Sequence, residues 1–129
     1  SDTKGVILGR YTEKVNHTIM ASARIEEYKD LTIKSGAEFL QYTKEKIEES
    51  YKDARFKPVD IKVSAERYRG GDCVRYDFTV EDHGAPHAQG SVLILTGYGF
   101  FFLHPDDAKY IININYSQRF PKGGCQVFS

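Results

Sequence analysis

The chain has no tryptophan, one methionine, two cysteines, four prolines and no net charge. It also lacks long apolar runs. The longest, residues 92–95 and 100–103, are far shorter than the stretch of about 18 residues that a membrane-spanning helix requires. Lysine plus arginine and aspartate plus glutamate balance at 18 each, whereas a dedicated nucleic-acid binder needs a basic excess to displace counterions. These absences argue against a transmembrane helix and against a nucleic-acid partner.

Cysteine is too scarce to build a metal site by itself. Cys73 and Cys125 are not spaced as metal ligands are, and no Cys-x-x-Cys motif occurs. In an oxidising compartment the two would form a disulfide, which contributes about 4 kcal/mol in the chain-entropy model. In the cytosol they would remain free thiols, and the sequence leaves both outcomes open. Residues 1–11 lack the basic start and long apolar core of a signal peptide. The sequence leaves open whether Ser1 is the first residue after a removed leader.

What the chain does contain is an ordinary globular composition. Its 129 residues suit one domain, residues 1–129, with 28% charged and 40% hydrophobic residues. A domain of this length buries about two thirds of the surface that its unfolded chain exposes. A hydrophobic core is therefore sufficient for folding, and the sequence predicts no cofactor.

One segment, residues 35–53, predicts a helix. Ser35 followed by Glu38 forms a capping box, in which each side chain accepts a hydrogen bond from an unpaired backbone N–H group. An apolar stripe at helical spacing is expected to pack on a sheet; it consists of Ala37, Leu40, Ile47 and Tyr51.

Strands are predicted on both sides of this helix. Residues 17–28 alternate between apolar and polar side chains. Residues 58–82 suggest a hairpin with its turn at Gly70 and Gly71, in which Val59, Ile61, Val63 and Ala65 share one face of the first strand and Val74, Tyr76, Phe78 and Val80 share one face of the second. Residues 91–116 contain further alternating or apolar runs, which Gly97 and Gly99 break or bend. The order is one strand, one helix, then four or five antiparallel strands. We expect an α+β fold, with a curved antiparallel meander of five to six strands and one main helix on one face.

Two histidine clusters are candidates for chemistry. His83 and His87 stand near Glu81 and Asp82, so they are weak candidates for zinc or copper ligands, although the glycine and proline between them favour a solvated loop.

The second cluster places His104 before Asp106 and Asp107, which would suit a base with an orienting carboxylate in a small hydrolase. No nucleophile lies nearby in the sequence, and Pro105 favours a turn. We expect a non-catalytic domain.

The aromatic content is high, with nine tyrosines and eight phenylalanines. Successive strand residues point to opposite faces, so Phe101 should point away from Phe100 and Phe102. A single helix covers one face, so some aromatic side chains must fill a second layer, line a cavity or form a partner surface. The candidate binding residues are Tyr98, Phe101, Phe102 and His104.

The stretch GGDCVRYDF, followed by FFFLHPDDAKYIININYSQRF, resembles small bacterial cell-envelope lipoproteins of unknown function. In these proteins a strand that ends in His-Pro precedes a strand that ends near Tyr-Ser-x-Arg; the matching residues of this chain are His104, Pro105, Tyr116, Ser117 and Arg119. The resemblance covers roughly residues 58–120. The layout also loosely resembles the PsbP-like fold, but lacks its clear C-terminal helix.

This resemblance implies a non-catalytic extracytoplasmic accessory domain, either periplasmic or membrane-anchored. In the membrane-anchored case, a lipid anchor would lie upstream of Ser1. We expect it to bind a protein partner, to self-associate or to act as a scaffold. One alternative is a carrier of a small apolar ligand in a cavity between helix and sheet. Another is the hydrolase that uses His104 with Asp106 or Asp107.

Overall fold

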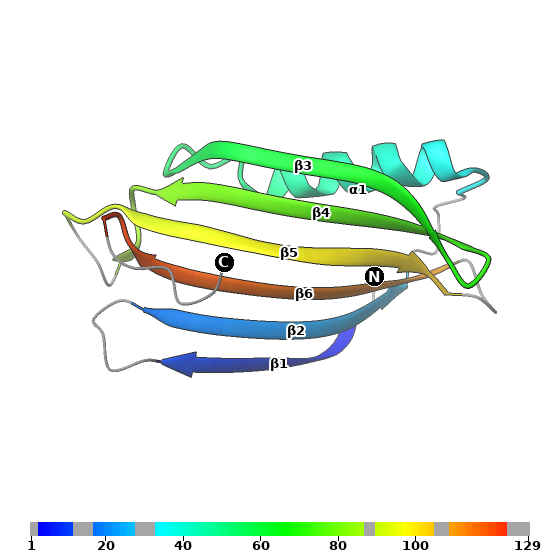
Figure 1. The fold of residues 1–129 in the computed structure, drawn as a ribbon, viewed down its shortest axis with the longest axis horizontal. Helices are drawn as coiled ribbons and strands as arrows, with labels where there is room; N and C mark the ends of the chain where they lie inside the picture. Colours follow the sequence, from blue (N-terminus) through cyan, green and yellow to red (C-terminus); the bar gives the residue numbers. More distant parts are fainter. Residues whose placement is uncertain (1–2, 12–16, 28–32, 87–89, 105–108, 124–129) are drawn as a thin grey trace.

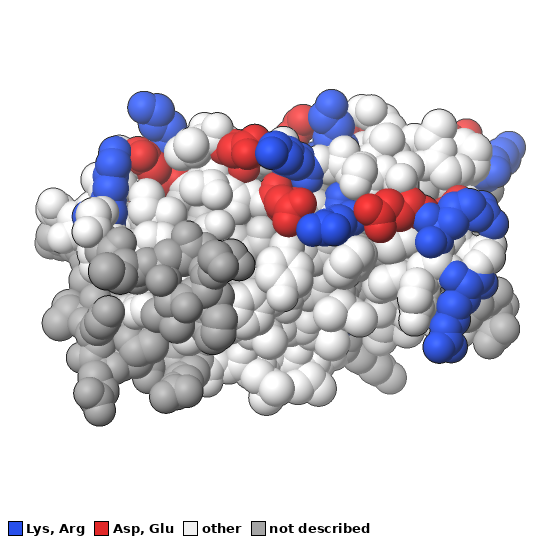
Figure 2. Space-filling model, viewed as in Figure 1, with Lys and Arg blue, Asp and Glu red and all other residues white. Residues whose placement is uncertain are grey.

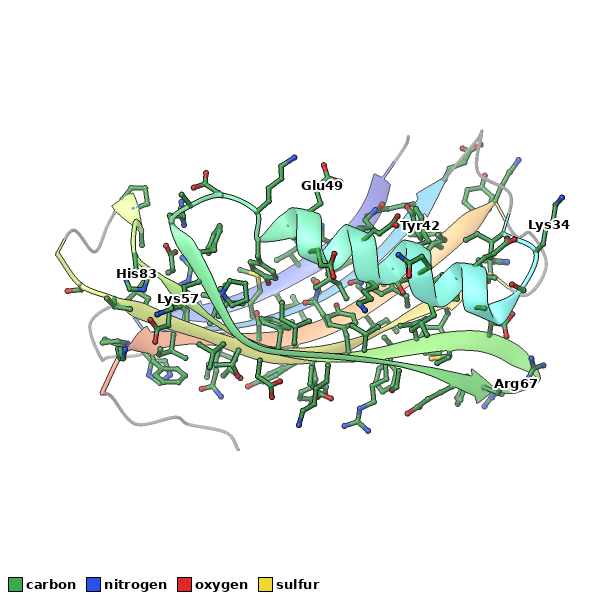
Figure 3. The ribbon with its side chains drawn as sticks, turned by 90° about the horizontal axis from the view of Figure 1, so that it is seen from above. Lys34, Tyr42, Glu49, Lys57, Arg67 and His83 are labelled. Carbon is green, nitrogen blue, oxygen red and sulfur yellow. The ribbon has the colours of Figure 1, made fainter. Side chains whose placement is uncertain are left out.

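The computed structural model describes residues 3–11, 17–27, 33–86, 90–104 and 109–123. They form a six-stranded sheet in the order β1-β2-β6-β5-β4-β3, in which all neighbours are antiparallel (Figure 1). One helix lies on one face of the sheet, over β3 and β4 (Figure 3). The elements are β1 (Thr3–Tyr11), β2 (Thr18–Glu27), α1 (Gly36–Ser50), β3 (Phe56–Tyr68), β4 (Gly71–Asp82), β5 (Leu93–Leu103) and β6 (Tyr110–Pro121).

The α+β class, with an antiparallel sheet and a helix on one face, is confirmed. Two strands precede the helix, however, and the sequence predicted one. The missed strand is β1, where Val6, Ile7 and Leu8 follow one another without alternation, so that no period of two is visible. In the part of the chain that the structure describes, no helix is long and apolar enough to cross a membrane.

The helix begins where the capping box predicts. The Glu38 backbone N–H donates to Ser35 Oγ at 3.2 Å, and the Glu38 carboxylate accepts from the backbone N–H of Lys34 at 2.8 Å. The buried side of the helix consists of Phe39, Thr43 and Ile47.

This buried side differs in part from the stripe that the sequence predicts. Ile47 is buried as expected, Leu40 is half-buried against the core, and Ala37 is exposed. Phe39 replaces Ala37 because it precedes Thr43 by four residues and Ile47 by eight, which sets all three on one face of the helix.

The hairpin between β3 and β4 is confirmed, but its turn lies one residue earlier than predicted. Tyr68 pairs with Gly71, which leaves Arg69 and Gly70 as the two turn residues. Both have positive φ angles, 51° and 78°, as a type I′ turn requires. The guanidinium group of Arg67 donates to the Gly70 carbonyl oxygen and to Asp72 Oδ1, which holds the two strands together at the turn.

The core lies between α1 and the face of the sheet that it covers. Alternate residues of β4 point into it: Val74, Tyr76, Phe78 and Val80. On β3 a bulge shifts the register between Pro58 and Asp60. Val59 is therefore exposed, although the alternation predicted that it would lie with the core-facing residues of its strand.

β5 runs without a break through Gly97 and Gly99, which the sequence suggested as a break or bend. Both glycines lie on the helix side, opposite Phe78 and Tyr76 of β4. A Cβ at Gly97 would stand 2.9 Å from Phe78 Cζ, and a Cβ at Gly99 would stand 2.6 Å from Tyr76 Cζ. The glycines thus make room for two large rings and do not end the strand.

Candidate functional site: the outer face of the sheet

The face of the sheet opposite α1, which we call the outer face, carries every second residue of each strand. On β5 the strand alternation places Phe101 in the core, 5% exposed and grouped with Phe39 of the helix, and places Phe100 and Phe102 on the outer face. The predicted split of the three phenylalanines is confirmed. Phe101 therefore belongs to the core and not to a candidate binding surface.

An aromatic row follows β5 along the outer face. The rings of Phe100 and Phe102 are stacked, with centroids 5.9 Å apart. Tyr68 on β3 meets Phe102 at 5.7 Å, and Tyr98 meets Tyr116 on β6 at 5.6 Å. Tyr98 and Phe102, both predicted binding residues, thus lie on the same surface. Burial, followed by the charge of Tyr98, raises the pKa of Tyr116, so the hydroxyl of Tyr116 is neutral at physiological pH.

Aliphatic side chains extend this row across the neighbouring strands. Val6 and Leu8 on β1 are 59% and 67% exposed, and Ile114 on β6 is 47% exposed. Large apolar side chains with this exposure are unusual when they form one continuous patch. We call the whole patch the apolar outer surface; it consists of Val6, Leu8, Ala21, Ala23, Ile25, Tyr98, Phe100, Phe102, Ile112, Ile114 and Tyr116.

The apolar outer surface meets a strip of charged residues. In Figure 2 lysine, arginine, aspartate and glutamate gather over β3 and β4, and the described surface next to them, over β5 and β6, is mainly uncharged. Within the strip, Lys62 lies 3.7 Å from Asp60, and Arg75 lies 3.6 Å from Asp77. Both signs are therefore present along one border of the apolar outer surface.

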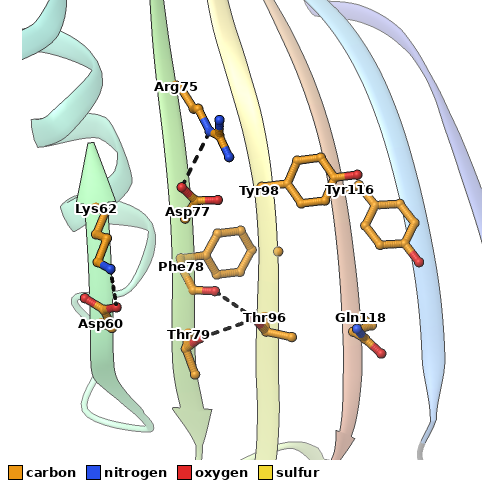
Figure 4. Close-up of a pocket in the computed structure, with 11 residues that line it drawn as sticks. Asp60, Lys62, Arg75, Asp77, Phe78, Thr79, Thr96, Tyr98, Tyr116 and Gln118 are labelled. Carbon is orange, nitrogen blue, oxygen red and sulfur yellow. Dashed lines mark hydrogen bonds and ion pairs between the residues drawn. The ribbon is translucent and has the colours of Figure 1, made fainter. Parts of the chain in front are cut away.

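A shallow groove of about 500 Å³ follows this border (Figure 4). One side carries the charged pairs and the other carries Tyr98 and Tyr116. Between them, Thr79 Oγ1 and Thr96 Oγ1 lie 3.3 Å apart, and Thr96 Oγ1 donates to the Phe78 carbonyl oxygen at 3.1 Å. The groove can take a chain segment that is apolar on one side and polar on the other.

A second groove, of about 260 Å³, lies on the helix side between α1 and strands β2 and β6. Its floor is polar. Ser22 Oγ donates to Asn115 Oδ1 at 2.9 Å, Asn115 Nδ2 to Asn113 Oδ1 at 3.1 Å, and Asn113 Nδ2 to the Tyr76 hydroxyl at 3.2 Å. Burial raises the pKa of Tyr76 although these amides oppose the shift. The carrier alternative stays a hypothesis, since this groove presents both apolar side chains and hydrogen-bonded amides.

The histidine candidates are only partly described. His104 follows the end of β5; its backbone N–H donates to the Tyr110 carbonyl oxygen at 2.9 Å, and the two rings meet edge to face at 6.2 Å. Asp106 and Asp107, its predicted partners, lie outside the described residues. His83 Nε2 lies 2.9 Å from Glu81 Oε1, and His87 also lies outside the described residues.

Glu81 also lies 2.9 Å from Lys122 Nζ. Hydrogen bonds from Lys122 and His83 lower the pKa of Glu81, so His83 belongs to a local hydrogen-bonded group with Glu81 and Lys122. Among the residues that the structure describes, no group of three or more histidine, cysteine, aspartate or glutamate side chains is placed to hold a metal ion.

Cys73 is buried, with 3% of its surface exposed, and its predicted disulfide partner Cys125 lies outside the described residues. Cys73 is on the outer face, where it pairs in register with Phe102.

Sequence reasoning missed the aliphatic part of the apolar outer surface. The alternation in residues 17–28 was correct, with Ala21, Ala23 and Ile25 on one face of β2, but this face points away from the helix. The signal was available in the polar helix-side residues of β2 and β6, which include Ser22 and Asn115. In this sheet the apolar residues lie on the helix side in some strands and on the outer face in others. In such a case the sequence does not show which face of the sheet the helix will cover.

Comparisons with known proteins give a likeness of fold only. No protein-family model matches the chain, and no curated protein matches it. The chain is similar to a crystal structure of PA94 from Pseudomonas aeruginosa, a protein of unknown function described as a candidate regulator. The two are 14% identical with a TM-score of 0.51, over 91% of this chain and 69% of that chain. At this identity the similarity shows a shared arrangement of sheet and helix.

Proposed function

We propose that this domain is a non-catalytic binding module that docks a protein partner on the apolar outer surface of a curved sheet. One observation supports this proposal: an apolar patch spans four neighbouring strands on the face of the sheet that α1 does not cover. Within this patch Leu8, Tyr98 and Ile114 are between 47% and 67% exposed. A contiguous apolar patch with a charged border is typical of a protein-interaction site.

The border defines the chemistry of the partner. The pairs formed by Lys62 with Asp60 and by Arg75 with Asp77 present both signs of charge beside Tyr98. The partner that fits is a chain segment with a continuous apolar stripe, flanked on one side by both basic and acidic residues. Aromatic side chains such as Tyr98 and Phe102 provide large, stiff contact area and are enriched among residues that dominate interface energy.

The resemblance to envelope lipoproteins supports an accessory or scaffolding role outside the cytoplasm. An alkaline phosphatase fusion to the full product of the natural gene tests the compartment. Phosphatase activity is expected, and a fusion that is inactive despite being expressed contradicts the extracytoplasmic part of the proposal but not the docking part.

Peptide selection tests the docking surface directly. A displayed library of random peptides is selected on the purified protein, and the enriched peptides are measured by calorimetry against variants. Ile114→Lys and Tyr98→Ser are expected to weaken binding at least about tenfold, because each removes apolar contact area. Val59→Lys is the matched control, since Val59 has similar exposure but lies on β3, outside the apolar outer surface.

Two results would overturn the docking proposal. One is the enrichment of peptides whose affinity is unchanged in Ile114→Lys and Tyr98→Ser. The other is binding that is lost instead in Arg24→Ala, because Arg24 lines the helix-side groove.

A further inference from the structure

β1 is an edge strand with little protection against pairing. Among the described residues it pairs only with β2, and it ends the strand order of the sheet. At its centre Val6, Ile7 and Leu8 are 59%, 60% and 67% exposed, so apolar side chains stand on both faces of the strand. Natural edge strands usually carry central charges, a proline or a bulge that prevents further pairing.

The opposite edge of the same sheet shows such protection. β3 contains Pro58, a bulge at Val59, and the charged residues Lys57, Asp60 and Lys62. Among the residues that the structure describes, one edge of the sheet is thus blocked and the other is open.

The residue types along β1 are arranged symmetrically about Ile7. Residues 4–10 read Lys-Gly-Val-Ile-Leu-Gly-Arg: a cation, a glycine, an aliphatic residue, Ile7, and then the same three kinds in reverse order. Two copies of β1 can pair in antiparallel fashion about a two-fold axis that passes through Ile7. Each residue i of one copy then lies opposite residue 14 − i of the other copy. This register pairs all nine residues of β1 and sets Val6 opposite Leu8 and Ile7 opposite its own copy.

We propose that the edge of β1 binds a second copy of this chain, in antiparallel register about Ile7. The two six-stranded sheets then become continuous, and their outer faces lie on the same side. Val6 and Leu8 belong to the apolar outer surface, so the two apolar outer surfaces join across the dimer axis. The proposal does not rest on partner docking, since it uses the backbone edge and not the outer face.

The same register sets Lys4 of one copy opposite Arg10 of the other. Like charges at these positions oppose association, and salt screens them. The dimer is therefore expected to tighten when ionic strength is raised from about 0.05 M to about 1 M, where the Debye length falls to about 3 Å.

Cross-linking tests the register. Cα atoms of directly opposed residues in antiparallel strands lie about 4.5–5.5 Å apart, within the range of a disulfide. In a Cys125→Ser background, Ile7→Cys is expected to give a covalent dimer under mild oxidation. Val59→Cys, similarly exposed on the blocked edge, is expected to remain monomeric on a non-reducing gel. Equal cross-linking of the two variants would show that collisions, and not pairing of β1, produce the bond.

A pair of charge variants tests the two-fold axis. Ile7→Lys and Ile7→Glu, each alone, place like charges opposite one another and are expected to weaken the dimer at least about tenfold in sedimentation equilibrium. Mixing the two should restore association as a heterodimer, which a merely unfolded variant cannot do. Ile114→Lys is expected to leave the dimer intact, which separates this proposal from partner docking.

Two outcomes would overturn the proposal. The first is wild-type protein that stays monomeric up to about 1 mM at high salt, where even a weak complex would be populated. The second is a dimer that persists unchanged in Ile7→Lys and in Ile7→Glu.

Discussion

The ring of Phe78 on β4 occupies the place that a side chain at Gly97 on β5 would take. The point where a Cβ would stand at Gly97 is 2.9 Å from Phe78 Cζ and also contacts the Tyr116 carbonyl oxygen of β6. Because the second contact is with backbone, the methyl group of an alanine cannot be accommodated by the movement of one side chain. This relationship connects the core under α1 with strands β5 and β6, which carry the aromatic row.

Gly97→Ala is therefore expected to destabilise the fold by about 1–3 kcal/mol, as overpacking of a core does. Urea denaturation followed by circular dichroism measures the change. Gly9→Ala is the matched control, because the nearest atom to a Cβ there is 4.0 Å away. If both variants have the wild-type midpoint, the ring of Phe78 does not lie against Gly97 of β5.

The helix offers a second comparison of neighbouring residues. Phe39 is fully buried, whereas Leu40 is half-buried at the margin of the core. We expect Phe39→Ala to cost about 3–5 kcal/mol and Leu40→Ala distinctly less, since part of Leu40 stays in contact with water in the folded state. Equal losses in urea denaturation, or a larger loss for Leu40→Ala, would show that the helix is rotated from the orientation in Figure 3.

Much of the fold could be predicted because local signals agreed with the tertiary structure. The capping box of Ser35 and Glu38 located the helix start, and the alternation from Val74 to Val80 identified the core face of β4. Errors occurred where a local sequence pattern was compatible with two different structures. Gly97 and Gly99 suggested a break because glycine is common in turns, whereas their actual role depends on rings from another strand.

The candidate site was less predictable than the fold. The sequence identified Phe102 as a member of the run of three phenylalanines and Tyr98 as a residue near that run, but it did not identify Val6, Leu8 or Ile114. These residues come together only through the pairing of β2 with β6, strands more than 80 residues apart in the sequence. Alternation within one strand shows which residues share a face, but it does not show which face remains uncovered.

The ion pair between Arg55 and Asp82 gives a pH-dependent prediction. Asp82 is completely buried, and Arg55 Nε and Nη2 bind its carboxylate at 3.0 and 2.8 Å. Burial alone would raise the pKa of Asp82, but hydrogen bonds from Arg55 and from the Gly84 backbone N–H outweigh it and lower the pKa. The pair contributes stability above the unfolded-state pKa of about 3.9 and loses it as the pH falls through the lower folded-state value.

Asp82→Asn is expected to reduce the free energy of unfolding at pH 7 by about 3 kcal/mol, because Arg55 loses its buried partner. The difference from wild type should shrink below about pH 4, where the Asp82 carboxyl of the unfolded wild-type chain begins to take up a proton while that of the folded protein does not. Urea denaturation at several pH values measures both effects. Asp77→Asn, at an exposed pair with Arg75, serves as control and should change stability by less than about 1 kcal/mol. A wild-type minus Asp82→Asn difference that is constant from pH 7 to 3 would contradict a stabilising role of the ionised carboxylate.

The thiol of Cys73 lies under an aromatic contact on the outer face. Tyr68 of β3 and Phe102 of β5 meet at 5.7 Å, and these strands flank the strand of Cys73. Burial, followed by the negative charge of Glu66, raises the pKa of the Cys73 thiol. The reactive thiolate is therefore scarce near pH 8, and the rings restrict the access of a reagent.

In the reduced protein, we expect native Cys73 to resist iodoacetamide at pH 8, and Tyr68→Ala to accelerate its labelling at least about tenfold, as shown by peptide mass mapping. The same experiment in denaturant without reductant tests the disulfide that an extracytoplasmic location predicts. If Cys73 and Cys125 are joined, neither takes up the label until a reductant is added, because a disulfide offers no thiolate to the reagent. Labelling of both in protein prepared under oxidising conditions would remove the residue-level support for an envelope location. It would leave the docking surface untouched, since that surface depends on Tyr98 and Ile114 and not on the cysteines.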